Sequence, residues 1–375
     1  MKSNYKKLGQ YIRQVDVRNT EGKEENLLGV SVQKMFIPSI ANTVGTDFTK
    51  YKVVKKGQFT YIPDTSRRGD KIGIALLTDY DEGLVSNVYT VFEVIDEHEL
   101  IPEYLMLWFS RPEFDRYARF KSHGSVREVM DWDEMCKVEL PVPSYEEQKR
   151  IVDSYKTITE RITLKQKIND NLFEQGKTIL KHLYDDTELF GEMTNLDCFC
   201  SNVVSGGTPS RTVDEFWDSN DVAWLKNGEI KNNIILSTEE FISNAGLNGS
   251  SAKLVPVYTV NMAMYCVSEI QVSLSCIPLS TNQAVLNLST ESFRKSCFVY
   301  YLMATYGNEI TSQANGSAQQ NLSKEKIVSF EFASPNIEDS SFDFLEVNMH
   351  ERIRIAKEII SLSEMQVALL SRLSH

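Results

Sequence analysis

Metal-binding and redox motifs are the first features that this sequence lacks. Its six cysteines include no Cys-x-x-Cys pair, and Cys198 and Cys200 are too closely spaced for a zinc knuckle. The five histidines are dispersed, with no His-Glu-x-x-His motif and no facial-triad arrangement. We therefore expect reduced thiols, no metal site and no bound cofactor.

Long apolar runs are also missing. No stretch approaches about 18 uninterrupted apolar residues, and the first residues, MKSNYKKLGQYIRQ, lack the apolar segment of a secretory signal. Hydrophobic residues make up 42% and charged residues 25%, close to the globular average, which argues against a disordered or fibrous chain. These features predict a cytoplasmic globular protein with no membrane association.

Positive charge is scarce. The 40 Lys and Arg against 52 Asp and Glu give a net charge of −12, unlike a protein that coats nucleic acid with its whole surface. The deficit is uneven, because residues 50–71 hold seven basic and two acidic side chains, whereas residues 187–345 hold 8 basic and 18 acidic ones. Residues 111–127 are also basic, with five cations against two carboxylates. A charged run is usually only a solvated face, so these tracts alone assign no function.

The 375 residues exceed one ordinary domain, and the chain repeats itself. Asn87 and Asn282 precede matching apolar segments 195 positions apart, and the Gly-Ser pairs at 124–125 and 316–317 lie 192 apart. In each half, β-branched alternating segments precede a helical pattern, in residues 103–120 and 297–314, and a final strand follows the Gly-Ser pair. The sequence therefore predicts two mixed α/β units of about 145 residues each.

Two long amphipathic helices are expected, one after each unit. Residues 145–183 contain no proline and follow Pro143-Ser144, a suitable stop and cap, and such a helix would be about 58 Å long. Its apolar seam consists of Ile151, Tyr155, Ile158, Ile162, Leu172, Ile179 and Leu183. The second stripe consists of Met349, Ile353, Ala356, Ile360, Val367 and Leu370. The two stripes predict an antiparallel coiled coil, and the alternative is that each helix packs only on its own domain.

Six short strings, each weak alone, occur in one order across nearly the whole chain. They are PVPSYEEQKRIV at 141–152, SGGTPS at 205–210, WLKNGEI at 224–230, SSAKLVP at 250–256, TNQA at 281–284 and GSAQQNL at 316–322. In this order and at these spacings the sequence resembles the specificity subunit of type I restriction-modification systems.

The resemblance implies a fold and a set of partners. Two tandem mixed α/β target recognition domains, residues 1–144 and 187–340, would each read one half of a bipartite target in double-stranded DNA. Residues 145–186 and 341–375 would be the conserved helices, which set the spacer and dock two methyltransferase subunits. Endonuclease/translocase subunits would join in the full complex, and this subunit itself would not be catalytic.

Two departures from the family pattern stand out. The first half lacks an SGGTPS opening and has LGVSVQK at 28–34 and IPS at 37–39 instead, so its reading loop should differ from the second one. The second helix, FDFLEVNMHERIRIAKEII at 342–360, lacks the EEQKRI motif of the first, which leaves its pairing register open.

DNA binding needs cations for phosphates and forked donors and acceptors for base edges. In the first half the expected DNA-binding residues are Lys34, Arg67, Arg68, Lys71, Asn87, Arg119, Lys121, Gly124, Ser125 and Arg127. In the second half, where amides outnumber cations, they are Gly206, Gly207, Thr208, Arg211, Lys226, Asn282, Gln283, Gly316, Ser317, Gln319, Gln320 and Asn321. On the first helix the expected partner-binding residues are Glu146, Glu147, Gln148, Ile151, Ile158, Ile162 and Leu172. Each of these could instead be an ordinary solvated, capping or turn residue.

Catalytic patterns find little support. The sequence has no P-loop, no Asn-Pro-Pro-Tyr-like methyltransferase loop and no glycine-rich cofactor loop. One carboxylate pair, Asp64 and Asp70, beside arginines is thin support for a metal-dependent nuclease. The alternative to DNA recognition is a non-DNA-binding two-globule coiled-coil scaffold for protein partners, which the acidity favours and the six strings oppose.

Overall fold

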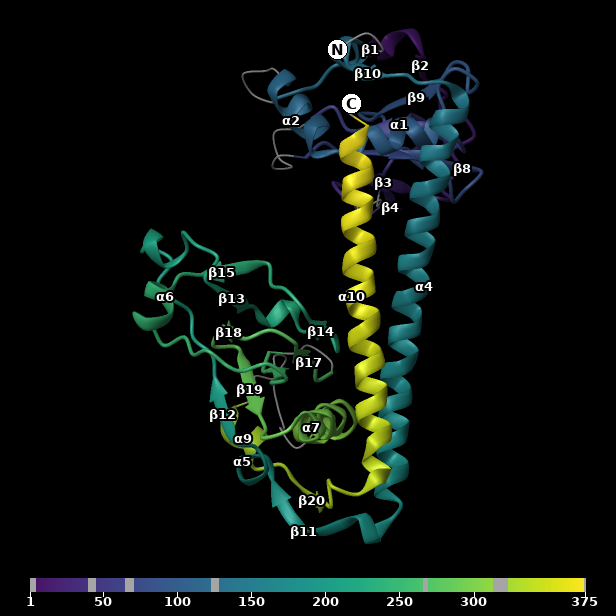
Figure 1. Cartoon of the computed structure of the whole chain (residues 1–375). Helices are drawn as coiled ribbons and strands as arrows, with labels where there is room; N and C mark the ends of the chain where they lie inside the picture. Colours follow the sequence, from purple (N-terminus) through teal and green to yellow (C-terminus); the bar gives the residue numbers. More distant parts are fainter. Residues whose placement is uncertain are drawn as a thin grey trace. The chain divides into compact units, whose positions relative to one another are not determined.

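The computed structural model describes residues 5–39, 45–64, 71–122, 128–265, 269–312 and 323–373. The chain divides into two compact units, one of Met1–Arg161 with Leu362–His375 and one of Ile162–Ser361 (Figure 1). Each unit contains a mixed α/β globule and a segment of two long helices, and each is described by itself.

The first unit is built on an antiparallel four-stranded sheet and several shorter strand pairs. The order of the main sheet is β2 (Ile12–Val15), β9 (Thr90–Val94), β6 (Phe59–Tyr61) and β7 (Ile74–Leu76). The short pairs are β3 (Leu28–Val30) with β4 (Phe36–Pro38), β5 (Lys52–Lys55) with β8 (Glu82–Val85), and β1 (Tyr5–Lys7) with β10 (Glu139–Pro141). A parallel bridge between Leu27 and Leu84 joins the first two of these pairs.

Three helices cover the main sheet of the first unit, namely α1 (Pro102–Phe109), α2 (Pro112–Lys121) and α3 (Trp132–Lys137). Phe92 of β9 stacks on Phe59 at 4.8 Å between ring centroids and meets Phe109 of α1 edge-on. The expected single helix over 103–120 is wrong. Pro112 occupies the first turn of α2, where its missing N–H costs nothing, but it cannot continue α1.

The second unit contains a five-stranded sheet, a three-stranded sheet and a strand pair. The five strands are ordered β12 (Asn202–Ser205), β19 (Val285–Ser289), β16 (Val260–Ala263), β17 (Val272–Ser275) and β14 (Ile234–Ile235). The three strands are β15 (Glu240–Ile242), β13 (Val222–Leu225) and β18 (Leu279–Thr281), and β11 (Phe190–Asn195) pairs with β20 (Glu331–Pro335).

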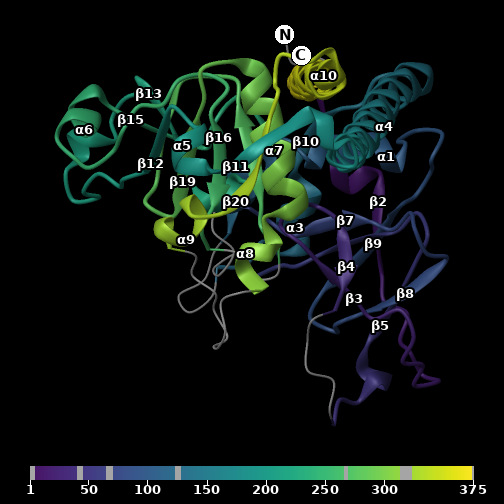
Figure 2. The same ribbon diagram turned by 90° about the horizontal axis from the view of Figure 1, so that it is seen from below.

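Helices of the second unit flank its sheets (Figure 2). They are α5 (Leu196–Phe199), α6 (Asn244–Asn248), α7 (Phe293–Tyr306), α8 (Asn308–Ser312) and α9 (Lys324–Val328). Buried residues of α7, from Cys297 to Met303, share one core with Val260, Val272 and Leu286 of the sheet. Here too the expected single helix, over 297–314, is wrong, because it breaks at Gly307, where an added Cβ would lie 2.4 Å from the Met303 carbonyl.

Strand pairing shows that the two units have the same topology. The order β2-β9-β6-β7 in the first unit repeats as β12-β19-β16-β17 in the second, and β1-β10 repeats as β11-β20. The parallel bridge from Leu27 to Leu84 repeats as the parallel pairing of β13 with β18, and the β5-β8 pair repeats as the bridge of Val255 with Leu279. The duplication predicted from the sequence is therefore confirmed at the level of the fold.

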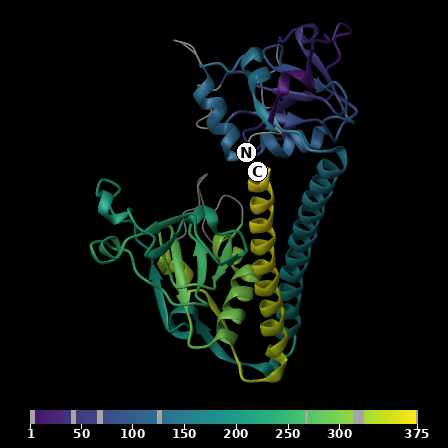
Figure 3. The ribbon, with the colours of Figure 1, turned by 45° about the horizontal axis from the view of Figure 1, so that its top comes forward.

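Two long helices, α4 (Tyr145–Tyr184) and α10 (Asp343–Arg372), follow the two globules, and α4 matches the predicted bounds within one residue. In the second unit Arg352 of α10 donates to Asn169 of α4, and Lys165 pairs with Glu358 at 2.6 Å, so the helices run antiparallel (Figure 3). In the first unit Gln366 donates to Thr159 at 2.6 Å. The predicted antiparallel pairing is confirmed.

Local sequence explains where α4 starts and ends. Ser144 caps α4, Glu146 and Glu147 occupy its first turn, and Lys181 and His182 occupy its last, as the helix dipole favours. Single 3-10 turns lie at Leu8–Gln10, Phe48–Lys50, Thr187–Leu189, Asp214–Phe216, Asn227–Glu229 and Ser340–Phe342. Within the described residues, we find no helix with the length and apolarity needed to cross a bilayer.

Candidate nucleic-acid interface

In the second unit, four of the six sequence strings come together around Gly206 and Gly207. The Gly207 N–H donates to the Thr281 carbonyl at 2.8 Å, and the Gly206 N–H donates to the Val285 carbonyl at 3.1 Å. A Cβ at Gly207 would lie 2.4 Å from Ser251, and one at Gly206 would lie 2.3 Å from the Asn282 carbonyl. Only glycine therefore permits this loop to lie directly on the 250–252 segment and the 281–282 turn.

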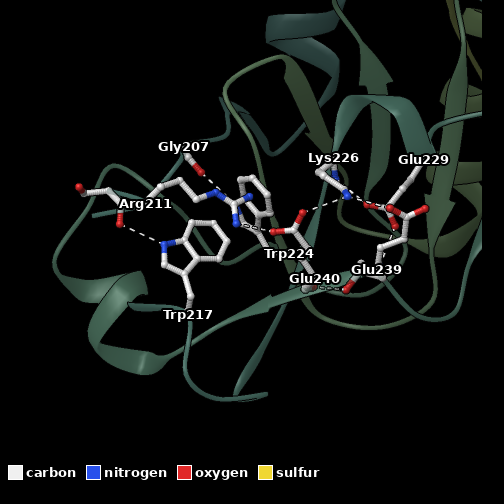
Figure 4. A network of polar contacts seen from close by, with 10 residues as sticks. Gly207, Arg211, Trp217, Trp224, Lys226, Glu229, Glu239 and Glu240 are labelled. Atoms are coloured by element: carbon white, nitrogen blue, oxygen red, sulfur yellow. Dashed lines mark hydrogen bonds and ion pairs between the residues drawn. The ribbon is translucent and has the colours of Figure 1, made fainter. Parts of the chain in front are cut away.

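Arg211 forms the centre of the cluster shown in Figure 4. Its guanidinium lies 3.5 Å from the centroid of the Trp217 ring and 5.1 Å from that of Trp224. The indole N–H of Trp224 donates to Gly207 at 3.1 Å, so the ring is fixed by the glycine loop. The two indole rings are perpendicular, with their centroids 5.0 Å apart, so the guanidinium stacks on Trp217 and lies close to Trp224. Stacking on Trp217 orients the planar cation before any ligand binds.

Two glutamates neutralise the cations of this cluster. Glu240 pairs with Arg211 at 2.6 Å and with Lys226 at 3.0 Å, and Glu239 pairs with Lys226 at 2.7 Å. The hydrogen bond from Arg211 lowers the pKa of Glu240, and the hydrogen bond to Glu239 raises the pKa of Lys226. In these ion pairs two carboxylates therefore face two cations.

The turn that carries Asn282 and Gln283 adds uncharged donors and acceptors beside this cluster. Asn282 accepts the Ala284 N–H at 3.2 Å through its own side chain, and the hydroxyl of Thr208 donates to Gln283. Gln283 is exposed, so its amide group is accessible at the surface. The matching turn of the first unit carries Asn87, which is also exposed.

The first unit presents a basic groove of about 840 Å³ that the sequence only partly predicted. Its charged and aromatic lining includes Lys71, Arg116, Arg119 and Phe120, and the last of these is 78% exposed. Arg119 pairs with Glu128 at 2.5 Å, while Lys121 next to the groove lies 4.0 Å from Glu134. Unlike Arg211 and Lys226, Lys71 takes part in no ion pair with the described residues.

Lys34 is placed differently from the prediction. Its side chain is only 8% exposed and pairs with Asp115 at 2.5 Å, and its ammonium also donates to the Ile72 carbonyl at 3.3 Å. Burial lowers its pKa, and the bond to Asp115 opposes that effect. This geometry assigns Lys34 to the structure of the loop, so we do not retain it among the expected phosphate contacts.

The comparison of LGVSVQK with SGGTPS is corrected by strand pairing. LGVSVQK begins with β3, whose pairings match those of β13, so it corresponds to the WLKNGEI string. The segment of the first unit that follows β2, residues 16–20, holds the position of SGGTPS after β12. Lys34 and Lys226 therefore occupy comparable segments, one buried and one at the surface.

Several expected residues fall outside the described part of the chain. They are Arg67, Arg68, Gly124, Ser125, Arg127, Gly316, Ser317, Gln319, Gln320 and Asn321.

The expected partner-binding residues of α4 have unequal surroundings. Gln148 is fully buried, accepts the Ile101 N–H at 2.8 Å and donates to Glu99 and Pro143, so it holds the start of the helix to its globule. Ile151 packs on the core of the first unit, and Glu147 pairs with Arg150 on the same helix. Glu146 is exposed, and Ile158, Ile162 and Leu172 are half-buried. Only part of this set is therefore accessible to another protein.

Sequence reasoning missed three residues of the second-unit cluster, Trp217, Glu239 and Glu240. A Trp close to an isolated Arg in an acidic domain is a usable signal for a stacked cation. The two glutamates had no such signal, because the pairing of β15 with β13 brings them to Lys226.

The fold and the site together define a class of protein, with two tandem α/β units of one topology that have polar turn clusters and are each followed by a long helix. The family model of the type I restriction modification DNA specificity domain matches residues 2–174 and 196–361. The chain therefore belongs to this family.

Individual relatives are distant. A type I restriction enzyme specificity subunit from Escherichia coli is 21% identical over 277 residues, covering 70% of this chain and 66% of that protein. A second specificity subunit, from Haemophilus influenzae, is 21% identical over 369 residues, and the match covers 76% of this chain and 78% of that protein. The chain thus spans slightly less than two thirds of the first relative.

A solved structure supports the fold. The type I restriction-modification S subunit from M. genitalium has a TM-score of 0.53 and 13% identity, and the match covers 99% of this chain and 96% of that one. At this identity the likeness shows the fold alone.

Proposed function

We propose that this chain is the DNA-recognition subunit of a type I restriction-modification complex, with each globule reading one half of a bipartite target. Residues 1–144 and 187–340 are the two recognition domains in this proposal. The observation that carries it is the repeated topology, which presents the turns of Asn87 and Asn282 at equivalent places in two separate units. Two copies of one reading surface on one chain suit a target made of two short separated sequences.

The chemistry of the two surfaces supports base reading. Exposed amides such as Gln283 can pair bidentately with adenine, and a stacked, forked cation such as Arg211 can pair with guanine. Phosphate contacts would come mainly from the groove of the first unit, where Lys71 and Arg119 lie.

In the same proposal the long helices set the spacer between the two half-sites and dock two methyltransferase subunits, with endonuclease/translocase subunits in the larger complex. The chain itself performs no catalysis and holds no cofactor. Glu146, Lys149 and Asp153, on one side of α4, line a shallow polar surface suited to such docking.

Methylome sequencing tests the proposal. A strain that carries this gene with its methyltransferase subunit should methylate one bipartite motif, and the same strain without the gene should lose that motif. An unchanged methylome would reject the proposal. The scaffold alternative, which the net charge of −12 favours, requires that the chain itself does not bind DNA at low salt.

A further inference from the structure

A buried arginine lies where helix α10 meets α4 and the second globule. Arg352 is 1% exposed, and no carboxylate of the described residues lies within ion-pair distance of it. Burying a guanidinium without a counter-ion is costly unless its donors are hydrogen-bonded. Such a residue needs an explanation beyond packing.

Two helices and a turn supply acceptors to Arg352. Its Nε donates to Asn169 of α4 at 3.2 Å, its Nη1 donates to the Tyr300 hydroxyl of α7 at 2.9 Å, and its Nη2 donates to the Asn232 carbonyl at 2.7 Å. The guanidinium also lies 5.0 Å from the centroid of Phe173 and 5.2 Å from that of Tyr300. One side chain thereby joins both long helices to the globule.

Asn348, one turn before Arg352 on α10, makes a second set of bonds. It donates to the Leu172 carbonyl at 3.0 Å and to Gln175 at 3.4 Å, both on α4, and it accepts the Tyr301 hydroxyl at 2.5 Å. A Cβ at Gly176 would lie 2.3 Å from the Tyr301 ring, so α4 must have glycine at this contact. We name Asn169, Asn232, Tyr300, Asn348 and Arg352 the register network.

These bonds can form together at only one axial position of α10 against α4. Apolar seams alone tolerate a slip by one turn, because similar side chains recur at steps of three and four residues. A slip here would leave a buried guanidinium and a buried amide without acceptors, which costs far more than an apolar mismatch.

Asn232 links this network to the candidate reading surface. It lies three residues after Glu229, which accepts the backbone N–H of Lys226 and that of Glu239 at 3.0 and 2.9 Å. The Asn232 side chain accepts the Val272 N–H at 3.0 Å, and its φ of 57° fits the left-handed conformation that Asn tolerates. The position of α10 is thus coupled to the segment that holds Lys226.

We propose that the register network fixes the pairing register of the two long helices and anchors the second recognition domain to that register, which makes Arg352 a positioning residue for spacer specificity. The spacer part rests on the proposed function, whereas the register part does not.

The first experiment measures the register without DNA. Thr159→Cys and Gln366→Cys, whose native side chains are hydrogen-bonded at 2.6 Å, are joined by a short bifunctional maleimide in a Cys198→Ser background, and mass spectrometry identifies the linked peptides. Arg352→Met should lower the cross-link yield at least about two-fold, because the remaining seam permits slip. The matched control is Arg354→Met, which removes an exposed cation paired with Glu351 and Glu358 on its own helix and should leave the yield unchanged.

The second experiment sequences the methylome with the same variants in the assembled complex. A complex with Arg352→Met should methylate sites of mixed spacer length, and the half-site sequences should stay unchanged. Arg352→Lys keeps the positive charge but not the planar set of donors, so its spread of spacer lengths should lie between those of the wild type and Arg352→Met. If Arg352→Met does not fold, Asn348→Leu, which leaves the Arg352 guanidinium its own three acceptors, should give the mixed spacers. A folded variant with wild-type cross-link yield would overturn the register proposal. A single wild-type spacer despite a reduced yield would overturn the spacer proposal, and a wild-type complex without a bipartite motif would reject the proposed function instead.

Discussion

The two globules have the same topology, but their candidate DNA-binding surfaces differ in how far the cations are paired with carboxylates. These surfaces are the basic groove of the first unit and the Arg211 cluster of the second. In the groove Lys71 is free of ion pairs with described residues, and Arg116 and Arg119 each have one carboxylate partner. In the cluster, Glu239 and Glu240 neutralise both Arg211 and Lys226. Among the described residues, one fold therefore carries a surface with unpaired positive charge in the first unit and a surface whose charges are paired internally in the second.

The compensated cluster suits selectivity more than affinity. A cation that is already paired with a glutamate gains little binding free energy when a phosphate replaces that glutamate, because one anionic partner is exchanged for another. The gain in binding free energy is larger where a base edge accepts two hydrogen bonds from the guanidinium, as guanine does from arginine. Under the proposed function, the first unit would supply most of the affinity for DNA and the second unit would discriminate more strictly between bases.

The largest expected effect concerns whether the units are independent. Phe92→Ala removes a buried ring that stacks on Phe59, and it should lower the free energy of unfolding of the first unit by about 3–5 kcal/mol. Hydrogen exchange should show the loss in β2, β6 and β9 while β16, β17 and β19 keep their protection. Equal loss of protection in both units would show that they unfold together.

The groove should dominate DNA affinity. Replacing Lys71, Arg116 and Arg119 by Gln should weaken DNA binding by the isolated chain about 10- to 100-fold and reduce the salt slope by about 0.9 for each phosphate that the variant no longer neutralises. Titration at two salt concentrations measures both quantities. The matched control replaces Lys149, Lys156 and Arg161 of α4, which lie outside the groove, by Gln, and a comparable loss of affinity there would contradict the assignment.

Freeing the second cluster should have a smaller effect of opposite sign. Glu239→Gln with Glu240→Gln leaves Arg211 and Lys226 without carboxylates, so affinity for non-specific DNA should rise about 3- to 10-fold, with a steeper salt dependence. The control is Glu188→Gln with Glu192→Gln, which removes the same charge from another surface of the same unit. An equal rise in both would mean that only net charge matters.

The smallest effect is a pH dependence of stability. Because the folded-state pKa of Glu240 is lowered, its stabilising contribution is complete above the ordinary pKa of 4.5 and is lost as the pH falls through the lowered value. The difference in unfolding free energy between the wild type and Glu240→Gln should therefore shrink below about pH 4.5. Denaturant titrations at pH 7 and pH 3.5 measure it, and a constant difference would contradict the ion pair.

The sequence predicted those parts of the fold that depend on local pattern and repetition. The seam from Ile151 to Leu183 predicted α4 within one residue, and the paired positions of Asn87 and Asn282 predicted the duplicated strands. The breaks at Pro112 and Gly307 were missed because the apolar spacing continues across them.

The site was less predictable, because it depends on long-range pairing. Glu240 reaches Lys226 only through the pairing of β15 with β13. Lys34 is held below the surface by its ion pair with Asp115, which is 81 residues away in the sequence. Residue type identified Arg211 and Lys34 equally as cations, and only the fold separates the surface cation from the buried one.

Exchange of the second globule shows whether each unit reads its own half of the target. Residues 187–340 are replaced by the corresponding part of a relative with a different target, and the methylated motif is sequenced in cells that also contain the methyltransferase subunit. One half of the methylated motif should change while the other half stays the same. A change in both halves, or in neither, would contradict the assignment of one half-site to each unit.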